Sequence, residues 1–256
     1  MKLKSLEDFF RHGDKFNLPG VSVDNVIFGF HENQLKVLLL QSAGKDIWML
    51  PGGFVDKKEH IDEAATRILK IRTGLDTIFL RQFYTFGSPF RSNNKILIKA
   101  LDSLNRKYNK DHWILQRFIT IGYYALVEYA TVNPQPDEFS FACEWCDLEA
   151  LPELLLDHQE IITKALQEMR LNLNYQPIGY NLLPKEFTMK NLQSIYETIL
   201  GRKLDRGNFN RKMSSYGILD KKEKHYTGGA HKAPYLYSFN KKKYFKALES
   251  GLGRDF

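Results

Sequence analysis

The sequence is poor in cysteine and has no long apolar segment. Two cysteines in 256 residues exclude the disulfide framework that holds many small secreted domains together. No stretch approaches the roughly 18 consecutive apolar residues that a membrane-spanning helix needs. The first eight residues also lack the apolar run of a secretion signal. We therefore expect a soluble, cytoplasmic protein with no membrane partner.

The composition excludes a disordered or collagen-like chain. Hydrophobic residues make up 43% and charged residues 26% of the sequence, which is ordinary for globular proteins. A chain of 256 residues has room for one large domain or two modest ones.

Positive charge is concentrated at one end of the chain. Residues 180–256 hold 16 Lys and Arg against 7 Asp and Glu, a net charge of +9. Residues 1–179 hold 21 Lys and Arg against 23 Asp and Glu, a net charge of −2. A basic excess confined to one small domain is typical of a nucleic-acid binder, although a solvated basic surface has the same composition.

The front of the chain mixes strands with helices. Apolar, aromatic and β-branched residues predict strands over 21–28, 35–40, 48–54, 80–86 and 118–128, the first two joined by a turn at 31–34. Helices are predicted over 62–73, which Gly74 ends, and over 154–171. Apolar residues at helical spacing predict an extra helix over 94–108.

The end of the chain has a different pattern. After a linker at 175–180, apolar stripes predict helices over 188–200 and 206–216, which Gly201 and Gly217 end. A basic loop over 221–232 then separates 218–219 from a strand at 235–239. Helix, turn, helix and hairpin in this order are typical of a winged helix-turn-helix domain, whose second helix enters the major groove of DNA.

One motif identifies the fold of the front part. Gly53, five residues, Glu59, seven residues, Arg67, and then 73–75 (Thr-Gly-Leu) resemble the Nudix box, which reads Gly-x5-Glu-x7-Arg-Glu-apolar-x-Glu-Glu-x-Gly-apolar. Flanking segments at 50–54 and 144–148 are similar to those of the family, so the resemblance covers about residues 18–172. It implies a Nudix-like α/β/α sandwich over 1–174. Together with the winged helix-turn-helix domain over 175–256, this gives an α+β fold.

The box lacks the acids on which Nudix chemistry depends. In Nudix hydrolases, helix glutamates bind magnesium, which bridges the diphosphate and neutralises charge as water attacks. Those three positions are Ile68, Ile71 and Arg72 in this sequence. A guanidinium about 4 Å from a cation is repelled by roughly 4 kcal/mol per unit charge at an effective dielectric near 20. The sequence therefore predicts a degenerate domain that is not an enzyme and holds no metal or cofactor.

The tail extends the resemblance to nearly the whole chain. Segments 182–188, 192–201 and 208–212 are similar to the Nudix-related transcriptional regulators, and most similar to the arabinose-responsive repressors among them. This resemblance implies a repressor that senses a small-molecule effector, a sugar such as L-arabinose more than a nucleotide. It places four effector-binding candidates near the old substrate cleft, Asp24, Gln41, Trp48 and Arg81, and Arg72 is a fifth candidate that could hold a phosphate.

The second helix of the tail and the loop after it supply the candidate DNA contacts. Asparagine and arginine suit adenine and guanine edges, and basic side chains suit phosphates. The candidates on the helix are Arg206, Asn208, Asn210, Arg211, Lys212, Ser214 and Ser215. Those on the wing are Lys221, Lys222, Lys224, His231 and Lys232. Because one short helix reads only a few base pairs, we expect a homodimer on a pseudo-palindromic double-stranded operator.

Two other functions fit parts of the sequence. The first is a Nudix hydrolase of ADP-ribose-like nucleoside diphosphates, with a rearranged metal site built from Glu59, Glu63 or Glu144. The second is an RNA-binding or partner-docking module, since a basic winged helix need not read DNA. Cys143 and Cys146 have the spacing of a metal pair, but a single pair on a strand favours two core or edge thiols.

Overall fold

The computed structural model describes residues 6–42, 47–76, 78–89, 91, 94–103, 109, 111–138, 140–225 and 233–252. Contacts divide the chain into two compact units: residues 1–29 with 36–165, and residues 30–35 with 166–256. The boundaries at 29/30 and 35/36 fall in a hairpin of two strands, Asn17–His31 and Gln34–Ser42. The boundary at 165/166 falls inside the helix His158–Asn172. The boundary at 174/175 that the sequence suggested stays a prediction. No helix in the described ranges has both the length and the apolar character needed to cross a membrane.

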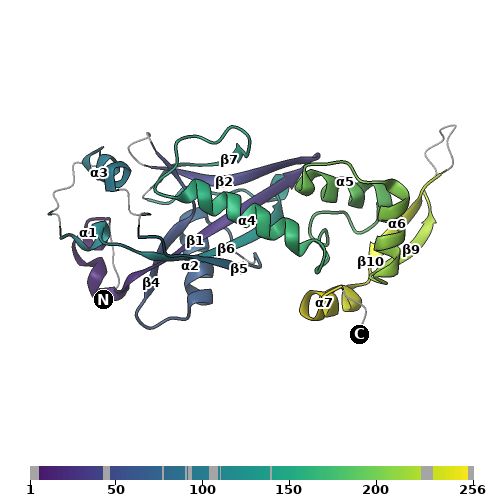
Figure 1. The fold of residues 1–256 in the computed structure, drawn as a ribbon, viewed down its shortest axis with the longest axis horizontal. Helices are drawn as coiled ribbons and strands as arrows, with labels where there is room; N and C mark the ends of the chain where they lie inside the picture. Colours follow the sequence, from purple (N-terminus) through teal and green to yellow (C-terminus); the bar gives the residue numbers. More distant parts are fainter. Residues whose placement is uncertain are drawn as a thin grey trace. The chain divides into compact units, whose positions relative to one another are not determined.

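The first unit is built on a mixed sheet (Figure 1). Its main strand order is β3-β2-β1-β6-β5, with β4 paired to β1 and β7 paired to β2. The strands are β1 (Asn17–His31), β2 (Gln34–Ser42), β3 (Trp48–Met49), β4 (Gly52–Asp56), β5 (Arg81–Phe86), β6 (Ile119–Glu128) and β7 (Ser140–Asp147). Glu32 and Asn33 adopt left-handed backbone conformations, as a two-residue hairpin turn requires, which confirms the predicted turn.

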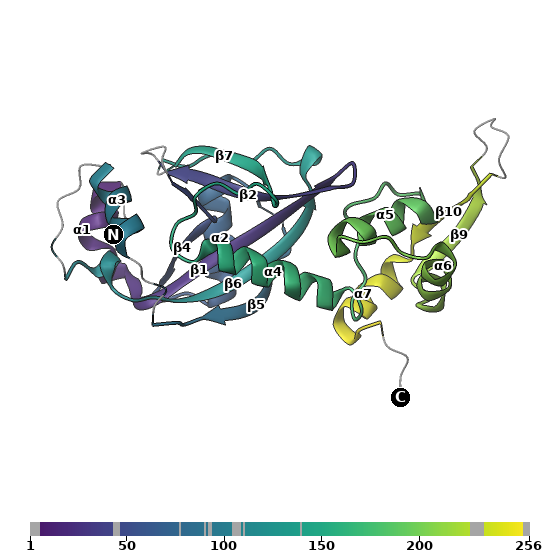
Figure 2. The ribbon, with the colours of Figure 1, turned by 45° about the horizontal axis from the view of Figure 1, so that its top comes forward.

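Four helices of the described residues accompany this sheet, and two of them, α2 and α4, cover its two faces. They are α1 (Leu6–Phe16), α2 (Ile61–Thr73), α3 (Asn94–Ser103) and α4 (His158–Asn172), with short 3₁₀ turns at Trp113–Leu115 and Tyr129–Thr131. Val23 of β1 packs against α2, whereas its neighbour Asp24 faces His158 of α4. Successive side chains of a strand point to opposite faces, so α2 and α4 lie on opposite sides of β1. Figure 2 shows α4 crossing one face of the sheet.

The predicted helix over 62–73 is confirmed and the predicted start of the next is wrong. Gly74 ends α2 with a left-handed backbone and donates its N–H to Lys70. The helix expected from 154 begins only at His158. The backbone before it pairs with β3, because Trp48 N donates to Glu153 O and Leu155 N donates to Trp48 O.

The helix predicted over 94–108 is observed as α3 (Asn94–Ser103), and residues 104–108 lie outside the described residues. Its Leu101 packs with Phe10 of α1 and with Leu115. Neither α1 nor the last helix of the described residues, α7 (Lys241–Ser250), was predicted from the sequence.

The second unit has the order of a winged helix (Figure 2). It contains β8 (Phe187–Thr188), α5 (Met189–Leu200), α6 (Arg206–Ser215), β9 (Leu219–Lys224), β10 (Tyr235–Phe239) and α7, with strand order β8-β10-β9. The stripe predicted from the sequence is buried: Leu192, Ile195 and Ile199 of α5 and Phe209 and Met213 of α6 are each 5% exposed or less. The segment predicted as a linker packs on α7, since Tyr175 O accepts from Leu252 N and Pro177 O accepts from the Tyr244 hydroxyl.

Candidate effector site and nucleic-acid interface

The glutamates that survive in the box belong to local networks. Glu59 accepts from the Arg67 guanidinium and from Asp56 N, and Arg67 also donates to Phe54 O. Glu63 accepts from His60 N at the start of α2, in a capping box. Glu59 therefore links the loop before α2 to the helix, and Glu63 caps the N-terminus of α2.

The three positions that lack glutamate have different environments. Ile68 is 3% exposed and packs with Val23, Val55 and Ile121, whereas Ile71 is 53% exposed. The Arg72 side chain is 13% exposed, and its Nη1 donates to Asp137 Oδ2 at 2.6 Å. Burial lowers the pKa of Arg72, and the charge of Asp137 offsets part of that effect. A buried ion pair thus lies where the helix of a Nudix hydrolase would present acids.

Asp137 reaches Arg72 because its segment passes the end of α2. Gln135 N donates to Thr73 O at 2.8 Å, which fixes the chain beside the last turn of the helix. The second guanidinium nitrogen of Arg72 contacts the Met49 sulfur at 3.5 Å. Asp137 lies 65 residues from Arg72, and no local pattern in the sequence could have indicated the pairing.

Neighbouring side chains leave little room for a Cβ at Gly52 and Gly53. A Cβ at Gly52 would collide with Oδ1 of Asp24, which lies opposite it in the β1–β4 pairing. A Cβ at Gly53 would lie 3.1 Å from Cγ1 of Ile68. Both glycines therefore allow close packing of β4, against β1 and against α2.

The acids of the alternative metal site do not come together. Glu59 and Glu63 are held as described, and Glu144 is exposed on β7, opposite Leu39 of β2. Within the ranges that the structure describes, no group of three or more His, Cys, Asp or Glu is placed to hold a metal ion.

The structure shows two pairs among the five effector-binding candidates. Gln41 pairs with Trp48 across β2 and β3, whereas Arg72 contacts Met49. Asp24 is near enough for its charge to raise the pKa of Arg72. Arg81 lies on β5, at the other end of the strand order from β3. Effector contact by any of the five stays a prediction.

A buried polar cluster surrounds Asp24 and was missed from the sequence. Arg91 donates to both carboxylate oxygens of Asp157, at 2.8 and 2.9 Å, and also to Phe118 O and the Thr120 hydroxyl. Burial lowers the pKa of Arg91, but Asp157 more than reverses the effect. Arg91 lies outside any predicted element and 66 residues from Asp157, so periodicity gave no signal for it.

His158 is a neutral member of this cluster. Its Nδ1 accepts from Leu50 N at 2.9 Å, so Nε2 carries the hydrogen, 3.7 Å from Asp24 Oδ1. Burial lowers the pKa of His158, although Asp24 acts in the opposite direction. The cluster joins β1, α4 and the segment before β4.

The two cysteines are protonated thiols on β7. Burial raises the pKa of Cys143 to about 12 and that of Cys146 to about 11. They are not bonded to each other. Neither has the lowered pKa of a reactive thiol.

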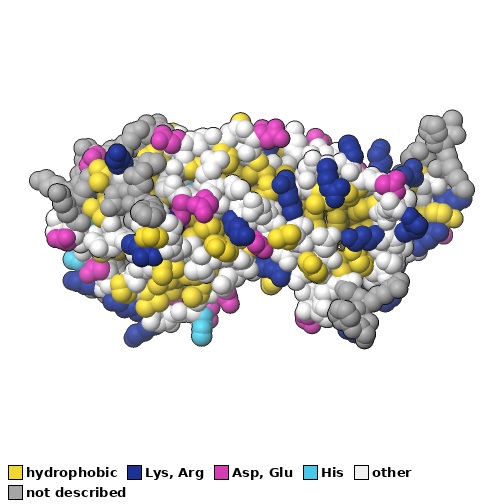
Figure 3. Space-filling view, viewed as in Figure 1, with side chains coloured by type: hydrophobic (Ala, Val, Ile, Leu, Met, Phe, Trp, Pro, Cys, Tyr) yellow, Lys and Arg dark blue, Asp and Glu magenta, His cyan; other side chains and the backbone are white. Residues whose placement is uncertain are grey.

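The predicted DNA-contact face of α6 is exposed. Phe209 and Met213 are buried, and most of the candidates on the helix are exposed: Arg206, Asn208, Arg211, Lys212, Ser214 and Ser215. Asn210 differs, because it is half-buried and its Oδ1 is enclosed without a hydrogen-bond partner among the described residues. Figure 3 shows Lys and Arg side chains gathered over the second unit. The candidate contacts themselves stay predictions.

Asn174 and Tyr235 contact lysine side chains among the DNA-contact candidates. Asn174 Oδ1 accepts from Lys212 Nζ at 3.2 Å. On the wing, the Lys221 and Lys224 ammonium groups lie 3.5 and 5.4 Å from the centre of the Tyr235 ring, in cation–π contact. Lys222 is exposed on β9, and the remaining wing candidates, His231 and Lys232, lie outside the described residues.

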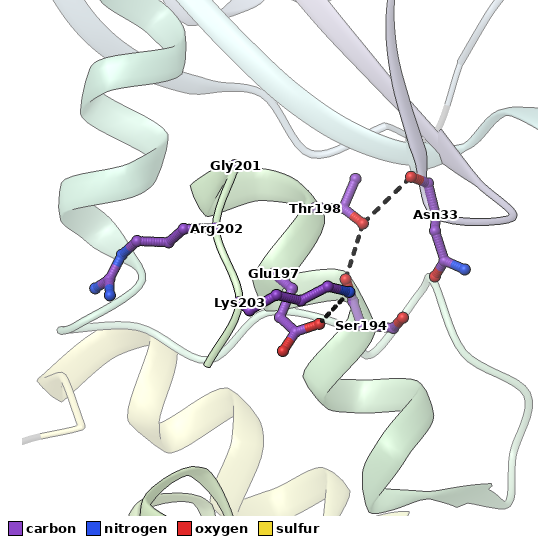
Figure 4. A pocket seen from close by; sticks show the side chains of 7 residues that line it. All are labelled: Asn33, Ser194, Glu197, Thr198, Gly201, Arg202 and Lys203. Carbon is purple, nitrogen blue, oxygen red and sulfur yellow. Dashed lines mark hydrogen bonds and ion pairs between the residues drawn. The ribbon is translucent and has the colours of Figure 1, made fainter. Parts of the chain in front are cut away.

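A hollow of about 330 Å³ lies beside the end of α5 (Figure 4). Glu197 in its wall accepts from Leu204 N, Gln193 Nε2 and Lys203 Nζ. The Leu204 and Gln193 hydrogen bonds lower the pKa of Glu197 to about 2. These bonds fix the turn between α5 and α6, so Glu197 has a structural role there.

Replacing Glu59 with glutamine should destabilise the first unit in a pH-dependent way. Burial by itself raises the pKa of Glu59, but the Arg67 and Asp56 hydrogen bonds hold it below its ordinary value. We expect a loss of about 1–3 kcal/mol at pH 7. A lowered folded pKa stabilises above the unfolded pKa, so the difference should shrink as the pH falls below about 4.3. Urea unfolding across pH 3–7 measures it; a pH-independent difference would contradict the pairing.

Comparison with known proteins supports the two-part organisation. Residues 18–168 match the NUDIX domain family, and residues 179–239 match the NrtR DNA-binding winged helix domain. The "ADPR responsive transcriptional repressor NtrR" of Acinetobacter baylyi is 31% identical over 228 residues, covering 86% of this chain and 82% of that protein. An ADP-ribose pyrophosphatase of Methanocaldococcus jannaschii is 29% identical over 147 residues, covering 56% of this chain and 71% of that protein.

The solved structures agree on the fold. The crystal structure of Shewanella oneidensis NrtR with a 27mer DNA superposes with a TM-score of 0.64 at 24% identity, covering 92% of this chain and 99% of that one. The predicted fold class, a Nudix domain followed by a winged helix domain, is confirmed. The expected likeness to arabinose-responsive repressors finds no support, since the repressor similar to this chain is named for ADP-ribose.

Proposed function

We propose that this chain, which belongs to the NUDIX family and is an NrtR-like repressor homologue, represses transcription in response to an effector. The proposed effector is ADP-ribose or a close nucleoside diphosphate analogue, which the protein does not hydrolyse. The observation that carries this proposal is the 31% identity to an ADP-ribose-responsive repressor along most of both chains. The proposal replaces the sugar effector that the sequence alone favoured.

Absence of hydrolysis is supported by the environment of α2. Metal-assisted cleavage of a diphosphate needs carboxylates that hold Mg²⁺ against the substrate. Ile68 is part of the core, and Arg72 is in a buried ion pair with Asp137. A domain that binds its ligand without cleaving it can act as a sensor.

DNA binding is assigned to α6 and the wing. The exposed polar face of α6 and the lysines of β9 are suited to base edges and phosphates respectively. One ten-residue helix spans few base pairs, so we propose that two copies bind a pseudo-palindrome. Sedimentation of the full chain at twice its monomer mass would support this dimer, and a monomer on and off DNA would rule it out.

Binding of a specific duplex tests the DNA half of the proposal. The full chain, incubated with a randomised duplex library, should enrich one pseudo-palindromic sequence and bind it saturably. Affinity should fall linearly on a log–log plot against salt, and Lys222→Ala should reduce the slope by about 1. Lys70→Ala removes one exposed charge from the first unit and should leave the slope unchanged. Equal binding of RNA, or enrichment of no duplex, would favour the module alternative.

The effector half is tested with ADP-ribose, ADP and L-arabinose. ADP-ribose should raise the melting temperature and change operator affinity, because a ligand acts through its differential affinity for two states. At 100 times its Kd a ligand stabilises the protein by about 2.7 kcal/mol. An effect of arabinose alone would overturn this assignment.

The same incubation with Mg²⁺ separates sensor from hydrolase. The similarity to an ADP-ribose pyrophosphatase keeps the hydrolase as the second candidate. A sensor leaves ADP-ribose intact, whereas a hydrolase adds water across the diphosphate and releases AMP and ribose 5-phosphate. Appearance of those products above a protein-free blank would establish the hydrolase.

A further inference from the structure

The exposed side chains of Asn208 and Arg211 on α6 form a hydrogen bond with each other. Arg211 Nη2 donates a hydrogen bond to Asn208 Oδ1, across one turn of the helix. Arginine has no acceptor atom, so the amide oxygen of Asn208 must be the atom that faces it. The pair is thus held in one orientation before any ligand arrives.

The helix turn beneath this pair is capped and packed. The Asp205 side chain caps α6 by accepting from Asn208 N at 2.8 Å, and the buried Phe209 lies between the two residues in sequence. The neighbouring Lys212 is held by Asn174, and the Ser215 hydroxyl donates to Lys212 O. Arg211 and Asn208 therefore present their remaining N–H groups side by side on this face.

Most of the remaining hydrogen-bonding groups of the pair are donors. To read adenine, an asparagine must accept from N6 with Oδ1 while it donates to N7 with Nδ2. Asn208 Oδ1 already accepts from Arg211, which turns this oxygen toward the guanidinium and leaves the Asn208 Nδ2 hydrogens and the other N–H groups of Arg211 for a base. Guanine is the base whose major-groove edge offers two acceptors, O6 and N7.

We propose that Arg211 reads a guanine and that Asn208 is a positioning residue that holds the guanidinium in the plane of that base. This specificity rests on the proposed DNA binding by α6. It differs from the adenine contact that asparagine side chains in general favour, and it assigns both residues to the same base pair.

The test starts from the sequence that the full chain selects from the randomised library. Arg211→Ala, Asn208→Ala and the double variant are then measured by fluorescence anisotropy on that duplex and on duplexes with each base pair changed. Lys70→Ala is the matched control, and circular dichroism checks that each variant is folded. If no duplex is selected, the proposed function itself fails before this question is reached.

Arg211→Ala should lower discrimination at one G·C pair by about 10-fold or more. Asn208→Ala should weaken discrimination at the same pair, and the double variant should discriminate no worse than Arg211→Ala. The effects of two residues that act as a unit are not additive. Additive losses, or relaxation of a separate A·T pair by Asn208→Ala, would overturn the proposal.

A modified base supplies a second readout. Replacing that guanine by 7-deazaguanine removes N7 and leaves O6 in place. The wild-type chain should lose several-fold in affinity, while Arg211→Ala should be insensitive to the change. Equal losses for both proteins would show that Arg211 does not contact the guanine.

Discussion

Replacing Arg91 with alanine is expected to destabilise the first unit by about 3–5 kcal/mol. The guanidinium is 5% exposed and binds both oxygens of Asp157, with the Asp24 carboxylate 4.0 Å away. Its removal leaves Asp157 buried without a cation and also removes the donors to Phe118 O and the Thr120 hydroxyl.

Tryptophan fluorescence in urea measures this loss selectively. The chain has three tryptophans, Trp48, Trp113 and Trp145, and all belong to the first unit. The midpoint should fall without a change in slope. Asp157→Ala in the Arg91→Ala background removes the carboxylate that has lost its cation. The double variant should therefore lose less unfolding free energy than the two single variants lose in sum. A loss below about 1 kcal/mol would mean that water replaces the guanidinium.

Restoring glutamate to the Nudix box should have opposite results at two positions. Ile68→Glu is expected to cost about 4 kcal/mol or more, because it removes a packed side chain and buries a carboxylate. Ile71→Glu, three residues later on the same helix, should change stability by no more than about 0.5 kcal/mol. Ile68 is 3% exposed and Ile71 is 53% exposed.

The same fluorescence assay compares these variants at two pH values. Near pH 4 part of the introduced carboxyl is neutral, and the cost of Ile68→Glu should decrease. Ile68→Leu nearly conserves volume and serves as the packing control, with an expected cost below about 1.5 kcal/mol. If Ile68→Glu were tolerated as well as Ile71→Glu, the position would be open to solvent and able to accept a metal-binding acid.

Local patterns predicted the elements whose determinants are close in sequence. The end of α2 follows from one glycine, and the two helices of the second unit follow from apolar stripes. The start of α4 was wrong because residues 153–155 pair with Trp48, about 105 residues away, and propensity carries no information on such a partner. Helices α1 and α7 were missed, although Asn240, whose side chain caps α7, is a start signal present in the sequence.

The residues of the candidate site were likewise predictable only where their determinants are close in sequence. The exposed face of α6 was predictable, because helical period alone separates Phe209 and Met213 from Asn208 and Arg211. The partners that decide what these residues do come from elsewhere in the fold: Asp137 for Arg72, Asn174 for Lys212 and Tyr235 for the wing lysines. Each pairing is set by the tertiary structure, which a single sequence does not report.

The steric needs of Gly52 and Gly53 bear on how such chains are recognised. Gly52 accommodates Asp24 and Gly53 accommodates Ile68, whether or not a phosphate ester is ever cut beside them. A motif search weighted on glycines will therefore retrieve chains with and without the acids of the box alike. The positions that distinguish the two groups are Ile68, Ile71 and Arg72 in this chain, and a screen for sensors should score whether they carry glutamate.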